Sequence, residues 1–118
     1  MYINWVTIHV RDLAAAKAFY GEYLGMPLSR EFPAGPDTTI AFFDGENGPE
    51  IELIHCPAEQ HAETKGITIG IRTEKYDELL AIAEEKGLIK KGPVQFGPDC
   101  LCFFVEDPDG VEVQIIKY

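Results

Sequence analysis

Apolar and polar residues alternate along much of this chain, and this alternation predicts β-strands. The first such stretch, residues 3–10, reads INWVTIHV. One set of its side chains is β-branched and is expected to pack against a helix, because alternate residues of a strand point to opposite faces. The opposite set carries the chemically versatile groups: an indole, a hydroxyl and an imidazole from Trp5, Thr7 and His9.

After this strand, the spacing of the apolar residues becomes helical. Asp12 is a good N-cap, and Gly25 is a typical residue for the end of a helix. Alternation then returns and predicts strands at residues 26–32, 38–43 and 50–55. In the last of these, Ile51 and Leu53 are expected to face the core, so Glu52 points to the other side.

The second half of the chain repeats this plan. A polar connector is predicted at about residues 57–66, followed by a strand at 67–72 and a helix at 75–86 that ends at Gly87. Further strands are predicted near residues 88–90, 101–105 and 112–117. The run 92–98, which contains two breaks rich in Gly and Pro, is interpreted as a mobile lid.

Two similar supersecondary units indicate an internal duplication. We therefore predict an α+β fold in which two βαβββ modules form a curved eight-stranded mixed sheet with the helices outside. The chain is expected to be one domain over residues 1–118. Module one covers about residues 1–56, the connector about 57–66 and module two about 67–118.

Composition narrows the range of partners. The formal net charge of −10 disfavours nucleic acid and favours a cationic ligand, although acidity also keeps a small protein soluble. No apolar run reaches the roughly 18 residues that span a bilayer, and the first residues lack the pattern of a signal peptide. We expect a soluble cytoplasmic protein with no nucleic-acid or membrane partner.

The three cysteines lack the CxxC spacing of a redox or zinc site. Cys100 and Cys102 alternate along a predicted strand and are interpreted as small core residues, with a reactive thiol as the alternative. His55 and His61 lie at a strand end and in a polar loop, and no role is predicted for them.

Two segments carry a family resemblance. The sequence VTIHVRDLAAAKAFYGEYLGMPL near the start and FFVEDPDGVEVQIIKY at the end resemble the vicinal oxygen chelate superfamily. This superfamily includes glyoxalase, extradiol dioxygenases and the bleomycin- and fosfomycin-resistance proteins. The resemblance covers nearly the whole chain and implies the βαβββ fold, a homodimer and a ligand cleft. It does not fix the function, because the superfamily contains both enzymes and binding proteins.

The resemblance also implies where a catalytic divalent metal would be held. The four ligand positions, usually His or Glu, correspond to Trp5, Glu52, Thr68 (or Ile67 if the register slips by one residue) and Gln114. Of these residues, only Glu52 has a side chain that binds divalent metals strongly. The Trp5 indole offers no lone pair, the Gln114 amide carries no charge, and the third position is not a usual ligand either. We therefore expect no metal or other cofactor, and Ni, Zn or Mn only under an enzymatic alternative in which Glu52 is a ligand. His9 lies roughly 13 Å along the strand from Trp5 and cannot replace it.

The ligand is expected to lie in a cleft lined by both modules. The proposed binding residues are Trp5, Thr7, His9, Glu52, Thr68, Arg72 and Gln114. Glu52 could orient a hydrogen-bonding ligand, act as a general base, or be a structural partner of Arg72. His9 is a candidate binding residue or proton shuttle, or simply an exposed histidine at a strand end.

The favoured interpretation is a glyoxalase/bleomycin-resistance-like protein that binds a small molecule without the catalytic metal. The alternative is a glyoxalase-like lyase or isomerase of the lactoylglutathione lyase type, acting on a small carbonyl or thiol adduct, with Glu52 as the catalytic candidate. An inert interaction module is a third interpretation, in which Trp5 would be buried against a partner chain.

Overall fold

The computed structural model describes residues 1–59 and 64–118 of the chain. The chain forms two compact units, Met1–Ala62 and Glu63–Tyr118. The predicted connector at residues 57–66 includes the part outside the described residues, and His61 is within that part.

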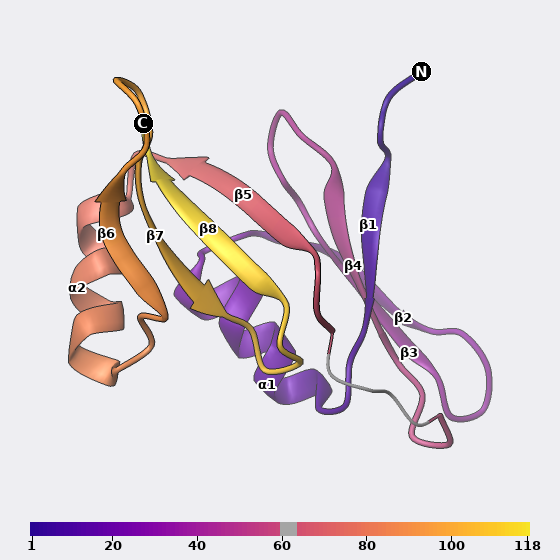
Figure 1. The fold of residues 1–118 in the computed structure, drawn as a ribbon. Helices are drawn as coiled ribbons and strands as arrows, with labels where there is room; N and C mark the ends of the chain where they lie inside the picture. The colour runs from indigo at the N-terminus through magenta and orange to yellow at the C-terminus, as the bar shows by residue number, and fades with distance from the viewer. Residues whose placement is uncertain (60–63) are drawn as a thin grey trace. The chain divides into compact units, whose positions relative to one another are not determined.

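Within residues 1–59, the N-terminal unit contains four strands and a helical segment (Figure 1). Their bounds are β1 Trp5–His9, α1 Leu13–Lys17, the π-helix η1 Ala18–Tyr23, β2 Leu28–Pro33, β3 Thr39–Phe43 and β4 Glu50–His55. The sheet order is β1-β4-β3-β2, and β1 is parallel to β4 while the other pairs are antiparallel. The first and last strands of the unit are therefore neighbours.

The helical segment starts and ends where the sequence predicts. The Asp12 carboxylate accepts a hydrogen bond of 3.1 Å from the Ala15 backbone N–H, which satisfies one free donor of the first turn. After Lys17 the helix widens, and the Leu24 N–H donates to the Phe19 carbonyl five residues back. Gly25, with a φ of 74°, then ends the segment in a backbone conformation that favours glycine.

The helical segment covers one face of its own sheet. Ile51 and Leu53 are 4% and 0% exposed, as their alternation predicts, and Tyr20 of η1 is fully buried. The contact is close at Gly21, where an added Cβ would lie 2.9 Å from the Phe43 ring. Side chains larger than hydrogen are therefore disfavoured at residue 21, and the opposite face of the sheet is left for other contacts.

Within residues 64–118, the C-terminal unit repeats this arrangement. Its elements are β5 Thr68–Thr73, α2 Tyr76–Lys86, β6 Lys91–Gln95, β7 Leu101–Glu106 and β8 Glu112–Lys117. The sheet order is β5-β8-β7-β6, with β5 parallel to β8. These elements confirm the predicted α+β fold of two βαβββ modules, with four strands in each sheet among the described residues.

Strand β6 corrects the sequence prediction. The strand expected near residues 88–90 lies at Lys91–Gln95, inside the stretch interpreted as a lid. Gly92 and Pro93 suggested a break, but β6 is an edge strand, and its pairing with β7 shifts between Lys91 and Val94. Proline is tolerated there because the missing N–H falls where the ladder is interrupted.

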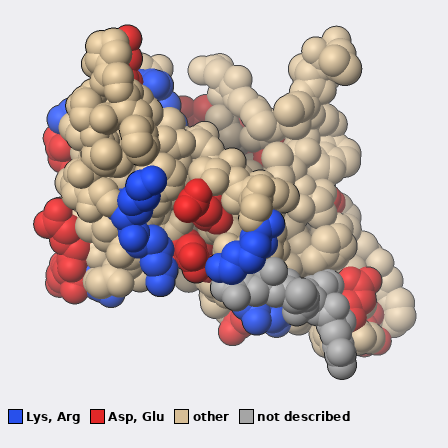
Figure 2. Space-filling model, viewed as in Figure 1, with Lys and Arg blue, Asp and Glu red and all other residues tan. Residues whose placement is uncertain are grey.

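Helix α2 packs on the C-terminal sheet through its apolar side. The Tyr76 and Phe103 rings meet edge to face with centroids 5.4 Å apart, and both residues are buried. Gly87, with a φ of 67°, ends the helix. The acidic residues Asp77, Glu78, Glu84 and Glu85 are exposed, and acidic side chains gather over α2 in Figure 2. No helix among the described residues is long and apolar enough to cross a membrane.

Candidate functional site

The face of the N-terminal sheet opposite α1 carries a row of four side chains, one from each strand. The strand register places Thr7 of β1 opposite Glu52 of β4, Glu52 opposite Phe42 of β3, and Phe42 opposite Arg30 of β2. We call these four residues the N-terminal row. A hydroxyl, a carboxylate, an aromatic ring and a guanidinium are thereby brought side by side.

Glu52 is the central polar group of this row. Its side chain is only 8% exposed, and the Thr7 hydroxyl donates a hydrogen bond of 2.5 Å to its Oε1. Among the described residues, no cation forms an ion pair with this carboxylate. Burying a carboxylate with a single neutral donor is unfavourable, so Glu52 is well suited to accept further hydrogen bonds or to attract a cation.

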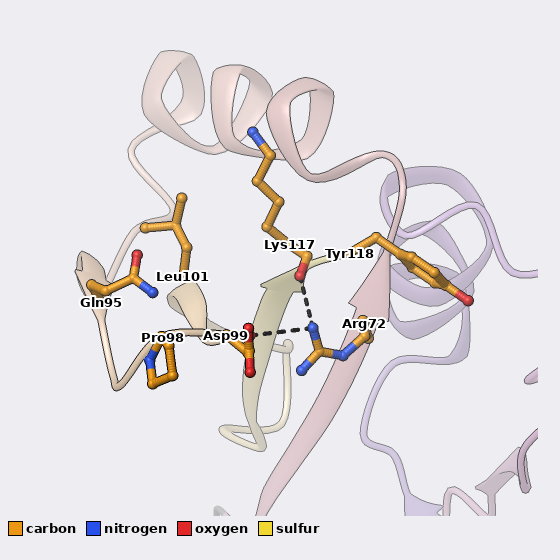
Figure 3. Close-up of a pocket in the computed structure, with 7 residues that line it drawn as sticks. All are labelled: Arg72, Gln95, Pro98, Asp99, Leu101, Lys117 and Tyr118. Carbon is orange, nitrogen blue, oxygen red and sulfur yellow. Dashed lines mark hydrogen bonds between the residues drawn. The ribbon is translucent and has the colours of Figure 1, made fainter.

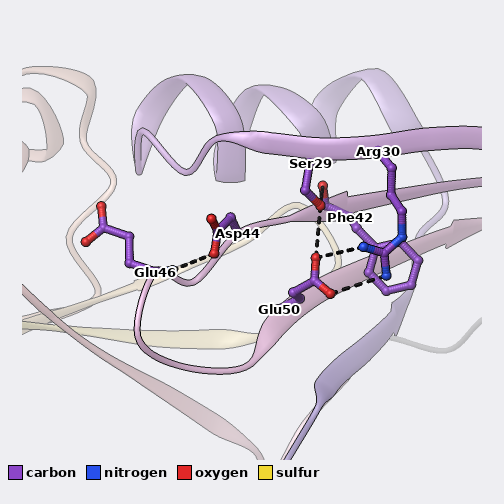
Figure 4. Close-up of polar contacts among 6 residues, drawn as sticks. All are labelled: Ser29, Arg30, Phe42, Asp44, Glu46 and Glu50. Carbon is purple, nitrogen blue, oxygen red and sulfur yellow. Dashed lines mark hydrogen bonds and ion pairs between the residues drawn. The ribbon is translucent and has the colours of Figure 1, made fainter.

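Arg30, by contrast, is already neutralised. Its guanidinium forms two hydrogen bonds of 3.2 Å to the Glu50 carboxylate, which also accepts a bond of 2.9 Å from the Ser29 hydroxyl (Figure 4). The same guanidinium lies 3.8 Å above the Phe42 ring. Glu50 therefore balances the charge of Arg30 and leaves the charge of Glu52 uncompensated.

Aromatic rings border Glu52. Trp5 meets Phe42 edge to face with centroids 5.4 Å apart, and Phe32 stacks on Phe42 at 6.3 Å. Trp5 is 43% exposed, so part of its indole is available for contact. An apolar surface next to a buried carboxylate is a common way to bind an organic molecule with a polar or cationic group.

His9 lies apart from Glu52 on the same face of the sheet. Its register partner is Ile54, and its Nδ1 lies 3.6 Å from the Glu59 carboxylate, with both side chains about half exposed. His9 therefore sits at the border of the N-terminal row.

The C-terminal sheet has a row at the matching positions. The register places Gly70 of β5 opposite Gln114 of β8, Gln114 opposite Phe104 of β7, and Phe104 opposite Lys91 of β6. We call these residues the C-terminal row. Here the carboxylate is replaced by an amide and the hydroxyl by a glycine, so the row lacks the hydrogen-bonded acid of the N-terminal row.

Gln114 and the two other predicted site residues of this unit have separate partners. The Gln114 Nε2 lies 3.3 Å from the Cys102 Sγ, and the Thr68 hydroxyl donates to the Glu112 carboxylate. Arg72 donates to the backbone carbonyls of Lys117 at 2.9 Å and Asp99 at 3.4 Å.

Arg72 also lines a pocket of about 260 Å³ at the ends of β5 and β8 (Figure 3). The other lining residues are Gln95, Pro98, Asp99, Leu101, Lys117 and Tyr118. Gln114 and Thr68 are not among them, so the three predicted residues do not form one site within this unit.

The sequence did not identify Arg30 and Phe42 as site residues. Alternation along residues 28–33 and 39–43 places them on the face that also carries Glu52, but their partners depend on the register. The register shift between Leu28 and Arg30 is not visible in the sequence. A face assignment for every strand could have nominated both residues as neighbours of the predicted site.

The donor groups do not fit the divalent metal site that the resemblance implies. In the N-terminal unit the two positions offer the Glu52 carboxylate and the Trp5 indole, which has no available lone pair. In the C-terminal unit they offer the Thr68 hydroxyl, already bonded to Glu112, and the neutral Gln114 amide. Among residues 1–59 and 64–118, no three His, Cys, Asp or Glu side chains form a group that could hold a metal ion.

Comparisons with known proteins identify relatives over nearly the whole chain. The model of the Glyoxalase/Bleomycin resistance protein/Dioxygenase superfamily matches residues 2–115. A lactoylglutathione lyase of Haemophilus influenzae is 34% identical, with 99% of this chain and 93% of that protein covered. A probable lactoylglutathione lyase of Synechocystis is 31% identical, with coverages of 99% and 95%.

A solved structure, glyoxalase I of Leishmania major, superposes with a TM-score of 0.78 at 26% identity and covers 99% of this chain and 86% of its own. The family inferred from the sequence is thereby confirmed.

Proposed function

The chain belongs to the Glyoxalase/Bleomycin resistance protein/Dioxygenase superfamily, and from this premise we propose that it binds a small organic molecule without a divalent metal ion. The binding surface is the N-terminal row together with Trp5. The observation that carries the proposal is the Glu52 carboxylate, which is 8% exposed, bonded to Thr7 and unpaired with any cation among the described residues.

The chemistry of this surface favours a planar cation. Trp5, which is 43% exposed and packs on Phe42, offers an aromatic surface, and the largely buried Glu52 carboxylate beside it offers a negative charge. The overall charge of −10 would favour the approach of the same ligand class. A homodimer in the cytoplasm, which the resemblance and composition predict, forms part of this proposal.

Binding is tested with N-methylquinolinium, a planar aromatic cation, by the fluorescence of Trp5, which is the only tryptophan of the chain. We expect a saturable change in emission and an affinity at least about tenfold lower in Glu52→Gln, because a hydrogen bond or contact to a charged group contributes roughly 1.5–3 kcal/mol. Neutral 2-methylnaphthalene should bind more weakly than the cation.

Glu31→Gln is the matched control, because Glu31 pairs with Lys17 on the opposite face of the sheet and its loss should affect binding little. Equal affinity of the wild type and Glu52→Gln for the cation would contradict the proposed role of Glu52.

Metal independence is tested separately by elemental analysis after incubation with Ni²⁺, Zn²⁺ and Mn²⁺ and removal of free ion. We expect no stoichiometric retention. Retention of about one ion per chain that is lost in Glu52→Ala would overturn the proposal and make a metal-dependent enzyme the better interpretation.

A lyase is the second candidate. The observation in its favour is the 34% identity to a lactoylglutathione lyase over 99% of this chain. Glu52 would then be the catalytic residue, acting as a general base beside the Thr7 hydroxyl. Formation of lactoylglutathione from the adduct of methylglyoxal and glutathione that is abolished in Glu52→Gln would favour this function over binding alone.

A further inference from the structure

Two cysteine side chains meet on the C-terminal sheet, outside the surface proposed above. Cys100 immediately precedes β7 and Cys102 lies within it, so the two side chains point to the same face. Cys102 is fully buried and Cys100 is half-buried. The Gln114 Nε2 lies 3.3 Å from the Cys102 Sγ and 3.8 Å from the Cys100 Sγ, so one amide group contacts both sulfurs.

The two thiols also interact with each other. Burial raises the pKa of Cys100, and the hydrogen bond and charge of Cys102 raise it further, while the Arg72 guanidinium opposes the rise. Cys100 is therefore protonated at neutral pH and should react slowly with reagents that attack single thiolates. A reagent that takes both sulfurs at once benefits instead from their contact, because the pair is already positioned.

We infer that Cys100 and Cys102 form a dithiol site for soft, thiophilic centres such as a monosubstituted trivalent arsenic compound. An arsenic centre of this kind needs only two protein sulfurs, because its third bond is to carbon. The C-terminal unit meets this requirement, because its described residues place two thiols together without a third side chain that could complete a metal site.

The reaction with phenylarsine oxide balances without an oxidant. Two S–H bonds and the bonds from arsenic to oxygen break, and two As–S bonds form. The oxygen leaves as water with both thiol protons, and arsenic remains trivalent. The Gln114 amide N–H groups face the sulfurs that become electron-rich in this step, and they stabilise them by hydrogen bonding.

The site is tested by treating the intact protein with phenylarsine oxide, washing with excess glutathione and measuring the mass. A monothiol removes arsenic held by one sulfur but not arsenic held by two, whereas 2,3-dimercaptopropanol removes both. We expect one phenylarsenic group per chain to survive glutathione and to be released by the dithiol.

Variants assign the sulfurs. Cys56→Ser is the matched control, since Cys56 is also half-buried but follows β4 in the N-terminal unit, and it should retain the adduct. Cys100→Ser and Cys102→Ser should each lose the adduct to glutathione. Because Cys102 is buried, circular dichroism is used to check that the Cys102→Ser variant folds. If that variant unfolds, the result for Cys100→Ser decides, because Cys100 is only half-buried.

Absence of a glutathione-resistant adduct in the wild type, or its persistence in Cys100→Ser, would overturn the inference and leave the two cysteines as core residues.

The role of Gln114 has its own readout. Gln114→Leu removes the amide donor, and the rate of adduct formation should fall about tenfold, because the developing thiolate loses a charge-assisted hydrogen bond. The rate in Gln114→Leu should also depend on pH with a midpoint shifted upward. An unchanged rate and pH profile would overturn this part of the inference. Neither result depends on Glu52, which lies in the other unit.

Discussion

The N-terminal row and the C-terminal row occupy matching positions in two sheets of the same strand order, and their outer members are alike. Arg30 lies 3.8 Å above the Phe42 ring, and Lys91 lies 5.2 Å from the centroid of the Phe104 ring. A cation on an edge strand therefore covers an aromatic ring on the next strand in both units. Such contacts contribute about 0.5–1 kcal/mol at exposed sites, so this part of the repeat adds to the stability of both units.

The inner members differ. Thr7 and Glu52 form a hydrogen-bonded hydroxyl and carboxylate, whereas Gly70 and Gln114 offer no such pair. A Cβ at Gly70 would make ordinary van der Waals contacts, at 3.6 Å from the Ile116 Cδ1 and 3.8 Å from the Gln114 Oε1. The amide instead contacts the cysteines at β7. Two copies of one scaffold can therefore keep the same packing while the central positions acquire different chemistry.

The largest difference that we expect between the units is in how much the turns after β3 and β7 contribute to the free energy of unfolding. Asp107 is 5% exposed, and its Oδ1 accepts hydrogen bonds from the backbone N–H groups of Asp109 at 2.8 Å and Val111 at 2.9 Å. Asp44, at the matching position, is exposed and accepts one bond of 2.8 Å from the Glu46 N–H.

We expect Asp107→Ala to lower the free energy of unfolding by about 3 kcal/mol, because two buried donors lose their acceptor, and Asp44→Ala by about 0.5 kcal/mol. Urea denaturation measures both changes. Asp107→Asn keeps an oxygen acceptor and should recover part of the loss. Equal effects of the two alanine variants would show that burial of the turn is unimportant.

We expect a smaller difference in stability when the threonine of each threonine–glutamate pair is replaced. Thr7→Val leaves the buried Glu52 carboxylate without its hydrogen bond, and we expect a loss of about 2 kcal/mol in stability. Thr68→Val breaks the bond to Glu112, but this carboxylate is less buried than that of Glu52, so water can replace the hydroxyl and the loss should stay below about 1 kcal/mol.

Thermal and urea unfolding measure these losses. Thr7→Ser keeps the hydroxyl and serves as the control, with stability close to that of the wild type. If Thr7→Val were as stable as Thr7→Ser, the hydrogen bond to Glu52 would not contribute to the fold.

The smallest expected effect concerns a tyrosine in the helical part of each unit. Burial raises the pKa of Tyr23 from 10.0 to about 12, and burial also raises the pKa of Tyr76. The unfolded chain releases these phenol protons at lower pH than the folded chain. Stability is therefore fully present below pH 10 and decreases as the pH rises toward about 12.

For Tyr23, which is half-buried, the decrease should be no more than about 1 kcal/mol because solvent screens its charge. Urea unfolding of the wild type and Tyr23→Phe at neutral and alkaline pH measures it. The difference in stability between the two proteins should change with pH. A constant difference would argue against a raised pKa of Tyr23 in the folded protein.

The sequence predicted which side chains share a face, because alternation has a fixed period of two residues. Ile51 and Leu53 are buried as expected, and Glu52 lies on the opposite face. The sequence could not predict which residues of neighbouring strands are paired, because the strand register depends on turn lengths and bulges. The contact of Gln114 with two cysteines and the stacking of Arg30 on Phe42 therefore became visible only in the structure.

Strand β6 shows a second limit. The residues Gly92 and Pro93 read as a break, since both are rare within strands. At the edge of a sheet, however, one side of the strand has no ladder, and a shift in pairing accommodates the missing donor. Whether a strand lies at an edge is a property of the assembled sheet, which local sequence does not contain.

The pairing of the first and last strand of each unit has a consequence for synthesis of the chain. The parallel partner of β1 is β4, which is complete at His55, so the N-terminal sheet can close while the second half is still being translated. In the C-terminal unit, β8 joins β5 to β7 and is the last strand of the unit to be made. Until it emerges from the ribosome, β5 and β7 carry unpaired edges, and these are the edges that a chaperone on the ribosome would protect.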